Sequence, residues 1–340
     1  MSDPVIAQAG ATSIFDGWFA SYWLVLLVKL LVVVGFFLTA PLLVGYMEHK
    51  VLAHMQSRIG PMYAGRFHGW AQLLADGVKF IQKEDIVPAA ADPWVYSMAP
   101  AVVLVPYIVT LVVIPFSPQI FALNLDVGIF FVLAISSVGV IGTLMAGWAS
   151  ANKFSLIGAL RAAAQLIAYE LPLVLAAAAV VMQAGTLSMV GISESQAGLW
   201  NIARPWQWIG FGAFVVASLA ELNRPPFDMP VADSEIIFGA LTEYSGLKFA
   251  FFLLSEYGGI VVLSAIAAVL YLGGYQGFFG IPEPLWMAGK IGALSFVVIW
   301  LRATYPRLRE DQLQRFSWQA LIPLTLVQIL VVAVIKIRFS

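Results

Sequence analysis

Residues 22–45 read YWLVLLVKLLVVVGFFLTAPLLVG, an apolar run that carries one charge, at Lys29. A helix needs roughly 20 such residues to cross about 30 Å of hydrocarbon, so the run predicts a first membrane-spanning helix. The basic region and small-residue cleavage site of a signal peptide do not accompany it, and we expect this helix to be retained.

The whole chain continues this apolar character. Of its residues, 61% are hydrophobic and 11% are charged, with a mean hydropathy of +0.89. A water-soluble domain of 340 residues does not pack with that composition, so we expect an all-α integral membrane protein in a single domain, residues 1–340. About eight transmembrane helices are expected, at approximately 22–45, 98–118, 127–149, 160–185, 207–222, 248–273, 286–303 and 319–338.

The polar residues gather in two loops on one side of the expected bundle. Most Lys and Arg residues lie on that side, which the positive-inside rule assigns to the cytoplasm, so both termini are expected on the other side. The first loop, 46–97, is too long for a simple connection and mixes apolar and charged residues at near-helical spacing. It predicts amphipathic helices on the membrane surface, whereas the second loop, 221–248, is strongly acidic.

Several kinds of chemistry are excluded by residue content. The chain has no cysteine, so it cannot ligate an iron–sulfur cluster through thiolates, attach a c-type haem or form a disulfide. Its three histidines, at positions 49, 54 and 68, do not form a His-x-x-x-His pair, and no metal site is expected. The glycines at 273–277 lack the lysine of a phosphate-binding loop, and without a basic cluster no nucleic-acid partner is expected.

Acidic residues are concentrated in one part of the chain. Six carboxylates occur between positions 221 and 256, against two bases, Arg224 and Lys248; the acids are Glu221, Asp228, Asp233, Glu235, Glu243 and Glu256. A charge at the bilayer midplane costs roughly 2.5 to 3.5 kcal/mol, so acids in or beside spans favour a role in proton or ion handling. Close acids titrate as coupled groups, which suits a proton entry. A solvated acid at a helix end remains an alternative for Glu221, because Asn-Arg-Pro-Pro follows it.

Glu170 lies in the first half of another apolar run. Arg161, Gln165 and Tyr169 are spaced to share one helical face, and Glu170 points elsewhere. Burial without a cation favours the neutral carboxyl, which suits a proton carrier. The alternative is a carboxylate that caps a neighbouring helix or pairs with an arginine such as Arg161.

A series of short strings occurs in a fixed order within residues 48–257. They are EHK at 48–50, MQSRIGP at 55–61, QLLADGVK at 72–79, KED at 83–85, GWAS at 147–150, LRAAAQ at 160–165, YE at 169–170, AELNRPPFD at 220–228 and TEYSGLK at 242–248. In sequence and order these strings resemble the H subunit of proton-pumping NADH:quinone oxidoreductase, respiratory complex I. Only the terminal helices lack a diagnostic string.

The resemblance implies roles for particular residues. Glu170, Glu221 and Glu256 would belong to a file of buried acids that leads from a quinone cavity toward the membrane arm. The loop 221–248, with Asp228, Asp233, Glu235 and Glu243, would line that cavity and move during turnover. The expected quinone-tunnel residues are Arg58, Asp76, Lys79, Arg224 and Phe227.

The resemblance also implies an assembly. Quinone would be the substrate, no cofactor would be bound by this chain, and flavin and iron–sulfur clusters would sit on partner subunits. The expected partners are the peripheral quinone-site and terminal-cluster subunits, small membrane subunits and lipid, in a bacterial inner membrane. The isolated chain is expected to have no redox activity.

Two other functions remain as alternatives. The membrane anchor of a proton-coupled hydrogenase would share the acid-rich helices but need no quinone tunnel, and the Arg58 loop favours the quinone interpretation. A stand-alone secondary transporter is disfavoured, because the sequence shows no internal repeat or paired broken helices.

The chain departs from the family strings at several positions. His49, Met62 and Ala151 replace an arginine and two asparagines that the family usually has. Val231 stands where a glutamate is expected, and Asp233 replaces a second glutamate. One loop carboxylate is therefore missing, which leaves the loop's acidic role to Asp228, Asp233, Glu235 and Glu243.

Overall fold

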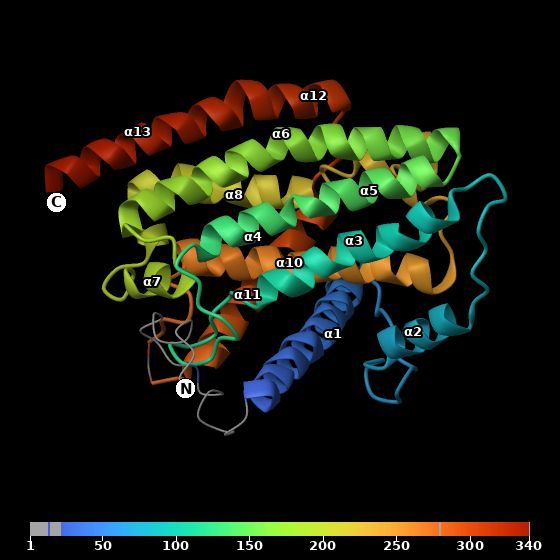
Figure 1. Cartoon of the computed structure of the whole chain (residues 1–340), viewed down its shortest axis with the longest axis horizontal. Coiled ribbons are helices and arrows are strands. Elements are labelled where there is room, and N and C mark those ends of the chain that lie inside the picture. Colours follow the sequence, from blue (N-terminus) through green and yellow to red (C-terminus); the bar gives the residue numbers. More distant parts are fainter. Residues whose placement is uncertain (1–12, 14–21, 279, 340) are drawn as a thin grey trace.

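A computed structural model of the chain describes Ser13 and residues 22–278 and 280–339, without the side chains of residues 233, 234 and 339. The described residues form helices and connecting loops and no β-strand (Figure 1). The α-helices are α1 (Tyr22–Met55), α2 (Gln72–Gln82), α3 (Pro93–Leu111), α4 (Gly128–Ser136), α5 (Val138–Ala149), α6 (Lys153–Ala184), α7 (Met189–Glu194), α8 (Trp208–Glu221), α9 (Asp233–Ile236), α10 (Gly246–Tyr271), α11 (Glu283–Thr304), α12 (Glu310–Arg315) and α13 (Ile322–Phe339).

Among the described residues, seven helical segments are long and apolar enough to cross a membrane. They correspond to seven of the expected spans, with α4 and α5 together forming the span Gly128–Ala149. The remaining span, expected at 207–222, is α8, which has 14 residues and a length of about 21 Å at 1.5 Å per residue. The expectation of an all-α integral membrane protein is confirmed, and α8 is a short apolar helix inside it.

The first helix is longer than its apolar run predicts. It continues ten residues beyond the expected end at 45, to Met55, and Pro41 lies inside it. Residues 46–55 of the expected first loop are therefore helical, and residues 93–97 belong to α3. Between them the loop contains one α-helix, α2, in which no residue is buried.

Helix α10 is the centre of the bundle. Every residue from Gly258 to Tyr271 is buried, and α10 runs between α6 with α8 on one side and α1 with α11 on the other (Figure 1). A Cβ atom on Gly259 would lie 2.5 Å from Cδ2 of Leu222, just after α8. Small residues in α10 therefore allow the end of α8 to pack closely against it.

The segment between α8 and α10 folds back on α6. The approach is closest where Gly158 faces the loop, since a Cβ atom on Gly158 would lie 2.5 Å from the Cα of Gly239. Gly239 has a φ of +53°, in the region that favours glycine. The two backbones can approach each other this closely because neither glycine has a side chain.

Candidate functional site

A cavity of about 590 Å³ opens where α8 ends. Residues of α3, α4, α5, α6, α10 and α11 line it, together with the loop that follows α8. Its acidic lining residues are Glu170, Glu221, Asp228 and Glu256. Its basic lining residues are Arg224, Arg302 and Arg307. We call this space the carboxylate cavity.

Two of these acids have no cationic partner among the described residues. The ion pairs there include Asp228 and Glu256 but not Glu170 or Glu221. Arg161, the cation considered as a partner for Glu170, instead lies 2.6 Å from Glu235. Glu170 and Glu221 can therefore each hold a proton without breaking an ion pair.

An ionic cluster with a buried centre forms one wall of the carboxylate cavity. Glu48 of α1 is 2% exposed and Arg224 is 1% exposed, and the two side chains are hydrogen-bonded. Arg302 of α11 also donates to Glu48, and Nε of Arg224 lies 2.9 Å from Oε1 of Glu256. Tyr257 places its ring 4.9 Å from the Arg224 guanidinium carbon.

The charges of this cluster balance. It holds two carboxylates, Glu48 and Glu256, and two guanidinium groups, Arg224 and Arg302. Burial alone would lower the pKa of Arg224, but the Glu256 and Glu48 carboxylates outweigh it and raise the pKa above its ordinary value. Arg224 is therefore a permanent positive charge in the wall of the carboxylate cavity.

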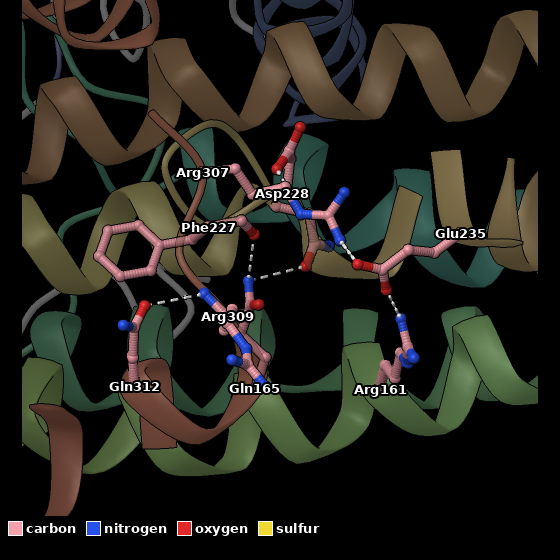
Figure 2. Close-up of polar contacts among 9 residues, drawn as sticks. Arg161, Gln165, Phe227, Asp228, Glu235, Arg307, Arg309 and Gln312 are labelled. Atoms are coloured by element: carbon pink, nitrogen blue, oxygen red, sulfur yellow. Dashed lines mark hydrogen bonds and ion pairs between the residues drawn. The ribbon is translucent and has the colours of Figure 1, made fainter. Parts of the chain in front are cut away.

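Gln165 fixes the turn that carries Arg224. Its buried Nε2 donates to the carbonyls of Ala220 and Phe227, each at 2.8 Å, and lies 3.1 Å from Oδ1 of Asn223. Figure 2 shows this amide below the turn. One α6 side chain thus satisfies the polar groups left open where α8 stops.

Farther along the loop, Glu235 joins three elements. Its carboxylate accepts from Arg161 of α6 and from Arg307, which follows α11, each at 2.6 Å (Figure 2). Arg307 also lies 3.7 Å from Asp228. The hydrogen bond from Arg161 and the charge of Arg307 hold the pKa of Glu235 below its ordinary value despite some opposing burial. We call Arg161, Glu235 and Arg307 the Glu235 clamp.

The Glu235 clamp is expected to open in acid. Because the folded pKa of Glu235 is depressed, its stabilisation is complete above the ordinary carboxyl value and is lost as the pH falls through the lower, folded value. Protection of backbone amides 229–241 against hydrogen exchange, taken relative to the intrinsic exchange rate at each pH, should therefore fall at the acid end of the pH range in the assembled complex. In Glu235→Gln this acid-dependent step should be absent; if it persists unchanged, the clamp is not its source.

The other expected proton-path residues are distributed as follows. Glu243 lies in the loop just before α10. Its carboxylate accepts from Asn152, the residue before α6, at 2.5 Å, and its carbonyl accepts from the Tyr96 hydroxyl at 2.7 Å. It does not line the carboxylate cavity. The side chain of Asp233 lies outside the described residues.

Of the five expected tunnel residues, one lines the carboxylate cavity, Arg224. Arg58 is exposed beyond the end of α1 and donates to Gln56. Phe227 is buried in the core, 3% exposed, with its ring 5.2 Å from that of Tyr169.

Asp76 and Lys79 form a pair on α2. The Lys79 ammonium lies 2.5 Å from Asp76 Oδ1. Burial alone would raise the pKa of Asp76, but hydrogen bonds from Lys79 and Gln72 hold it below its ordinary value. Neither residue lines the carboxylate cavity. The structure thus brings four of the acids together with Arg224 and places Arg58, Asp76 and Lys79 in a separate region.

Sequence reasoning did not single out Glu48, Arg302 or Arg307 as site residues. Glu48 follows the apolar run of α1 by three positions, and a helix extended through it would have predicted a buried acid. Arg302 and Arg307 flank the end of an apolar helix, where basic residues are common, so the sequence held no specific signal for them.

Comparisons with known proteins identify the family of the chain. The sequence profile of the family described as NADH dehydrogenase matches residues 28–333. The NADH-quinone oxidoreductase H subunit of Geobacillus kaustophilus is 44% identical over 296 residues, covering 86% of this chain and 88% of the relative. The H subunit of Dehalococcoides mccartyi is 44% identical over 314 residues, covering 92% and 88%. The H 2 subunit of Geobacter metallireducens is 40% identical over 336 residues, covering 93% and 96%. The chain belongs to the family of NADH-quinone oxidoreductase H subunits.

Proposed function

We propose that this chain is the membrane subunit of a proton-translocating NADH:quinone oxidoreductase that holds quinone in the carboxylate cavity and moves protons through its buried acids. One observation carries the proposal: four acids and three arginines from distant parts of the chain line a single cavity. The electrons arrive from partner subunits, since this chain has no cysteine to hold a cluster.

The size and lining of the carboxylate cavity support a quinone ligand. At about 590 Å³, it falls within the range of roughly 300–1,000 Å³ typical of small-molecule sites. Its apolar residues suit the ring and isoprenoid tail, and the guanidinium groups suit the carbonyl oxygens. Reduction of a quinone to a quinol consumes two electrons and two protons, which would make the nearby acids useful as proton donors.

The acids can be ordered by their partners. Asp228 and Glu256 contact arginines, whereas Glu170 and Glu221 have no cationic partner among the described residues. A proton held on Glu221 at the end of α8 could pass to Glu170 of α6 within the same cavity. The loop acid Glu235 would then control the loop's position through the Glu235 clamp and carry no proton itself.

The proposed setting is a bacterial plasma membrane with both termini on the non-cytoplasmic side. Flavin and iron–sulfur clusters would reside on peripheral subunits that cover the end of the bundle where α2 lies, and small membrane subunits and lipid would pack around the helices.

Purification in mild detergent tests this proposed assembly. We expect flavin- and cluster-bearing subunits to co-purify with the chain and the preparation to show inhibitor-sensitive quinone reduction. A nickel protein in their place would indicate a hydrogenase anchor, and a solitary chain from a preparation that preserves membrane complexes would indicate a transporter. The family assignment favours neither alternative.

Arg58 tests the expected quinone tunnel separately from the carboxylate cavity. It lies away from the carboxylate cavity, so Arg58→Met should leave chemistry intact and raise the apparent KM for long-tailed quinones about fivefold, as expected for one lost polar contact. Steady-state kinetics with long- and short-tailed quinones provide the measurement. Lys83→Met, another exposed cation of the same loop, is the matched control. If KM is unchanged for every quinone, Arg58 does not line a tunnel.

A further inference from the structure

Helix α6 contains a proline two residues after Glu170. Pro172 lies inside α6 and is buried. Proline has no backbone N–H, so the carbonyl four residues earlier, that of Ala168, loses the donor that an unbroken helix would supply. Glu170 lies between these two residues and lines the carboxylate cavity.

The missing donor is replaced from the last helix. Ser317 is completely buried, and its hydroxyl donates to the Ala168 carbonyl at 2.5 Å. Ser317 belongs to a π-helical segment, Phe316–Leu321, inserted between α12 and α13. Such insertions are uncommon and recur at functional sites, because the extra residue re-aims the side chains around it.

Two further bonds join this part of α6, from Ala164 to Tyr169, to the residues just before the π-helical segment. The Tyr169 hydroxyl donates to the Leu313 carbonyl at 2.9 Å, and Gln314 donates to the Ala164 carbonyl at 3.2 Å. In Figure 1, α12 and α13 lie along the length of α6. The turn of α6 that precedes Pro172 is therefore held by side-chain bonds where its own backbone bond is missing.

We propose that Ser317 is a positioning residue for Glu170: by occupying the carbonyl that Pro172 leaves open, it fixes the turn of α6 from which Glu170 reaches the carboxylate cavity. The inference rests on the proposed role of Glu170 as a proton carrier. It assigns a part in the reaction to the last helix, which carries none of the cavity's acids. A shift of α12 and α13 along α6 would change the position of Glu170 through the hydrogen bond between Ser317 and the Ala168 carbonyl.

The test measures NADH-to-quinone turnover and proton movement in membranes that contain the assembled complex. Ser317→Ala removes the hydroxyl and should lower turnover about fivefold, the factor expected for one buried hydrogen bond. Ser317→Cys, with a weak donor, should give an intermediate value and serves if the alanine variant assembles poorly. Thr110→Val is the matched control, because among the described residues the buried Thr110 hydroxyl bonds within its own helix, to the Pro106 carbonyl of α3. Thr110 does not line the carboxylate cavity, so turnover should not change.

Rescue separates positioning from general packing. In Pro172→Ala/Ser317→Ala, the new N–H at position 172 can donate to the Ala168 carbonyl, so turnover should return to that of Pro172→Ala alone. If the double variant is as slow as Ser317→Ala, or if Ser317→Ala has no effect, the inference is overturned. This comparison uses no Glu170 variant, so its result can be interpreted even if Glu170 variants have no activity.

A second cycle separates this inference from the proposed function. In a Glu170→Gln background, Ser317→Ala should cause no further loss if Ser317 acts through Glu170; an equal fold-loss in both backgrounds overturns the inference. If Glu170→Gln alone leaves turnover and proton movement unchanged, the proposed role of Glu170 fails, and the inference fails with it.

Discussion

Glu221→Gln is expected to lower NADH-to-quinone turnover about a hundredfold, the lower end of the range for loss of a positioned acid or base. Glu221 ends α8 and lines the carboxylate cavity, and the ion pairs of the described residues do not include it. Glutamine keeps the shape and polarity of the side chain and removes only the ability to carry a proton. Turnover and proton movement should therefore fall together while the amount of assembled complex stays normal.

Turnover is measured with membranes in which assembly has been verified by native electrophoresis. Glu194→Gln is the matched control, since Glu194 is an exposed acid at the end of α7 and lies outside the carboxylate cavity. Normal coupled turnover in Glu221→Gln would contradict the proton role. Normal turnover without proton movement would instead place Glu221 in the transport path but outside the chemistry at quinone.

Glu221→Asp refines the result. Aspartate retains a titratable carboxyl but withdraws it by one methylene, so recovery of part of the turnover would show that titration is required at this place. No recovery at all would show that the position of the carboxyl matters as much as its charge. Both outcomes differ from that of a structural polar residue, for which glutamine would substitute better than aspartate.

The spans were predictable because hydropathy and length determine which segments cross a bilayer. The end of α1 was not predictable, because residues 46–55 are polar enough to resemble a loop. In the structure, Glu48 packs against two arginines, which stabilises this polar end of the helix. The shortness of α8 was already visible in the expected range 207–222. In the structure, two 3-10 turns, Asn201–Ala203 and Pro205–Gln207, precede α8.

The site was predictable in part, for a physical reason. Acids in apolar surroundings are costly, so Glu170, Glu221 and Glu256 stand out in a sequence without any structure. The ionic cluster does not stand out in this way: Glu48 is 176 residues from Arg224 and 254 from Arg302. Such pairs depend on how the helices pack, which one sequence does not specify. For the same reason, periodicity could place Arg161 and Gln165 on one face of α6 but could not identify Glu235 and the α8 turn as what they contact.

Arg224→Met is expected to have the largest effect on assembly. Arg224 is almost fully buried and contacts both carboxylates of the ionic cluster. Its loss leaves two acids against Arg302 alone, and removal of one partner from a buried ion pair typically costs about 3–5 kcal/mol. The thermal inactivation temperature of the detergent-purified complex should fall clearly, and the membranes should contain less of it. Arg309→Met is the control, because Arg309 is 82% exposed beside Asp311 and such pairs contribute only about 0–1 kcal/mol.

Charge balance makes this prediction specific. Arg224→Met/Glu256→Gln removes one charge of each sign and leaves Glu48 paired with Arg302, so the double variant should be more stable than Arg224→Met alone. If the cluster mattered only through packing, the second substitution would add to the damage. Recovery of assembly without recovery of turnover would then separate two roles of Arg224: neutralising buried acids so that the bundle can form, and presenting a fixed positive charge to the substrate in the carboxylate cavity.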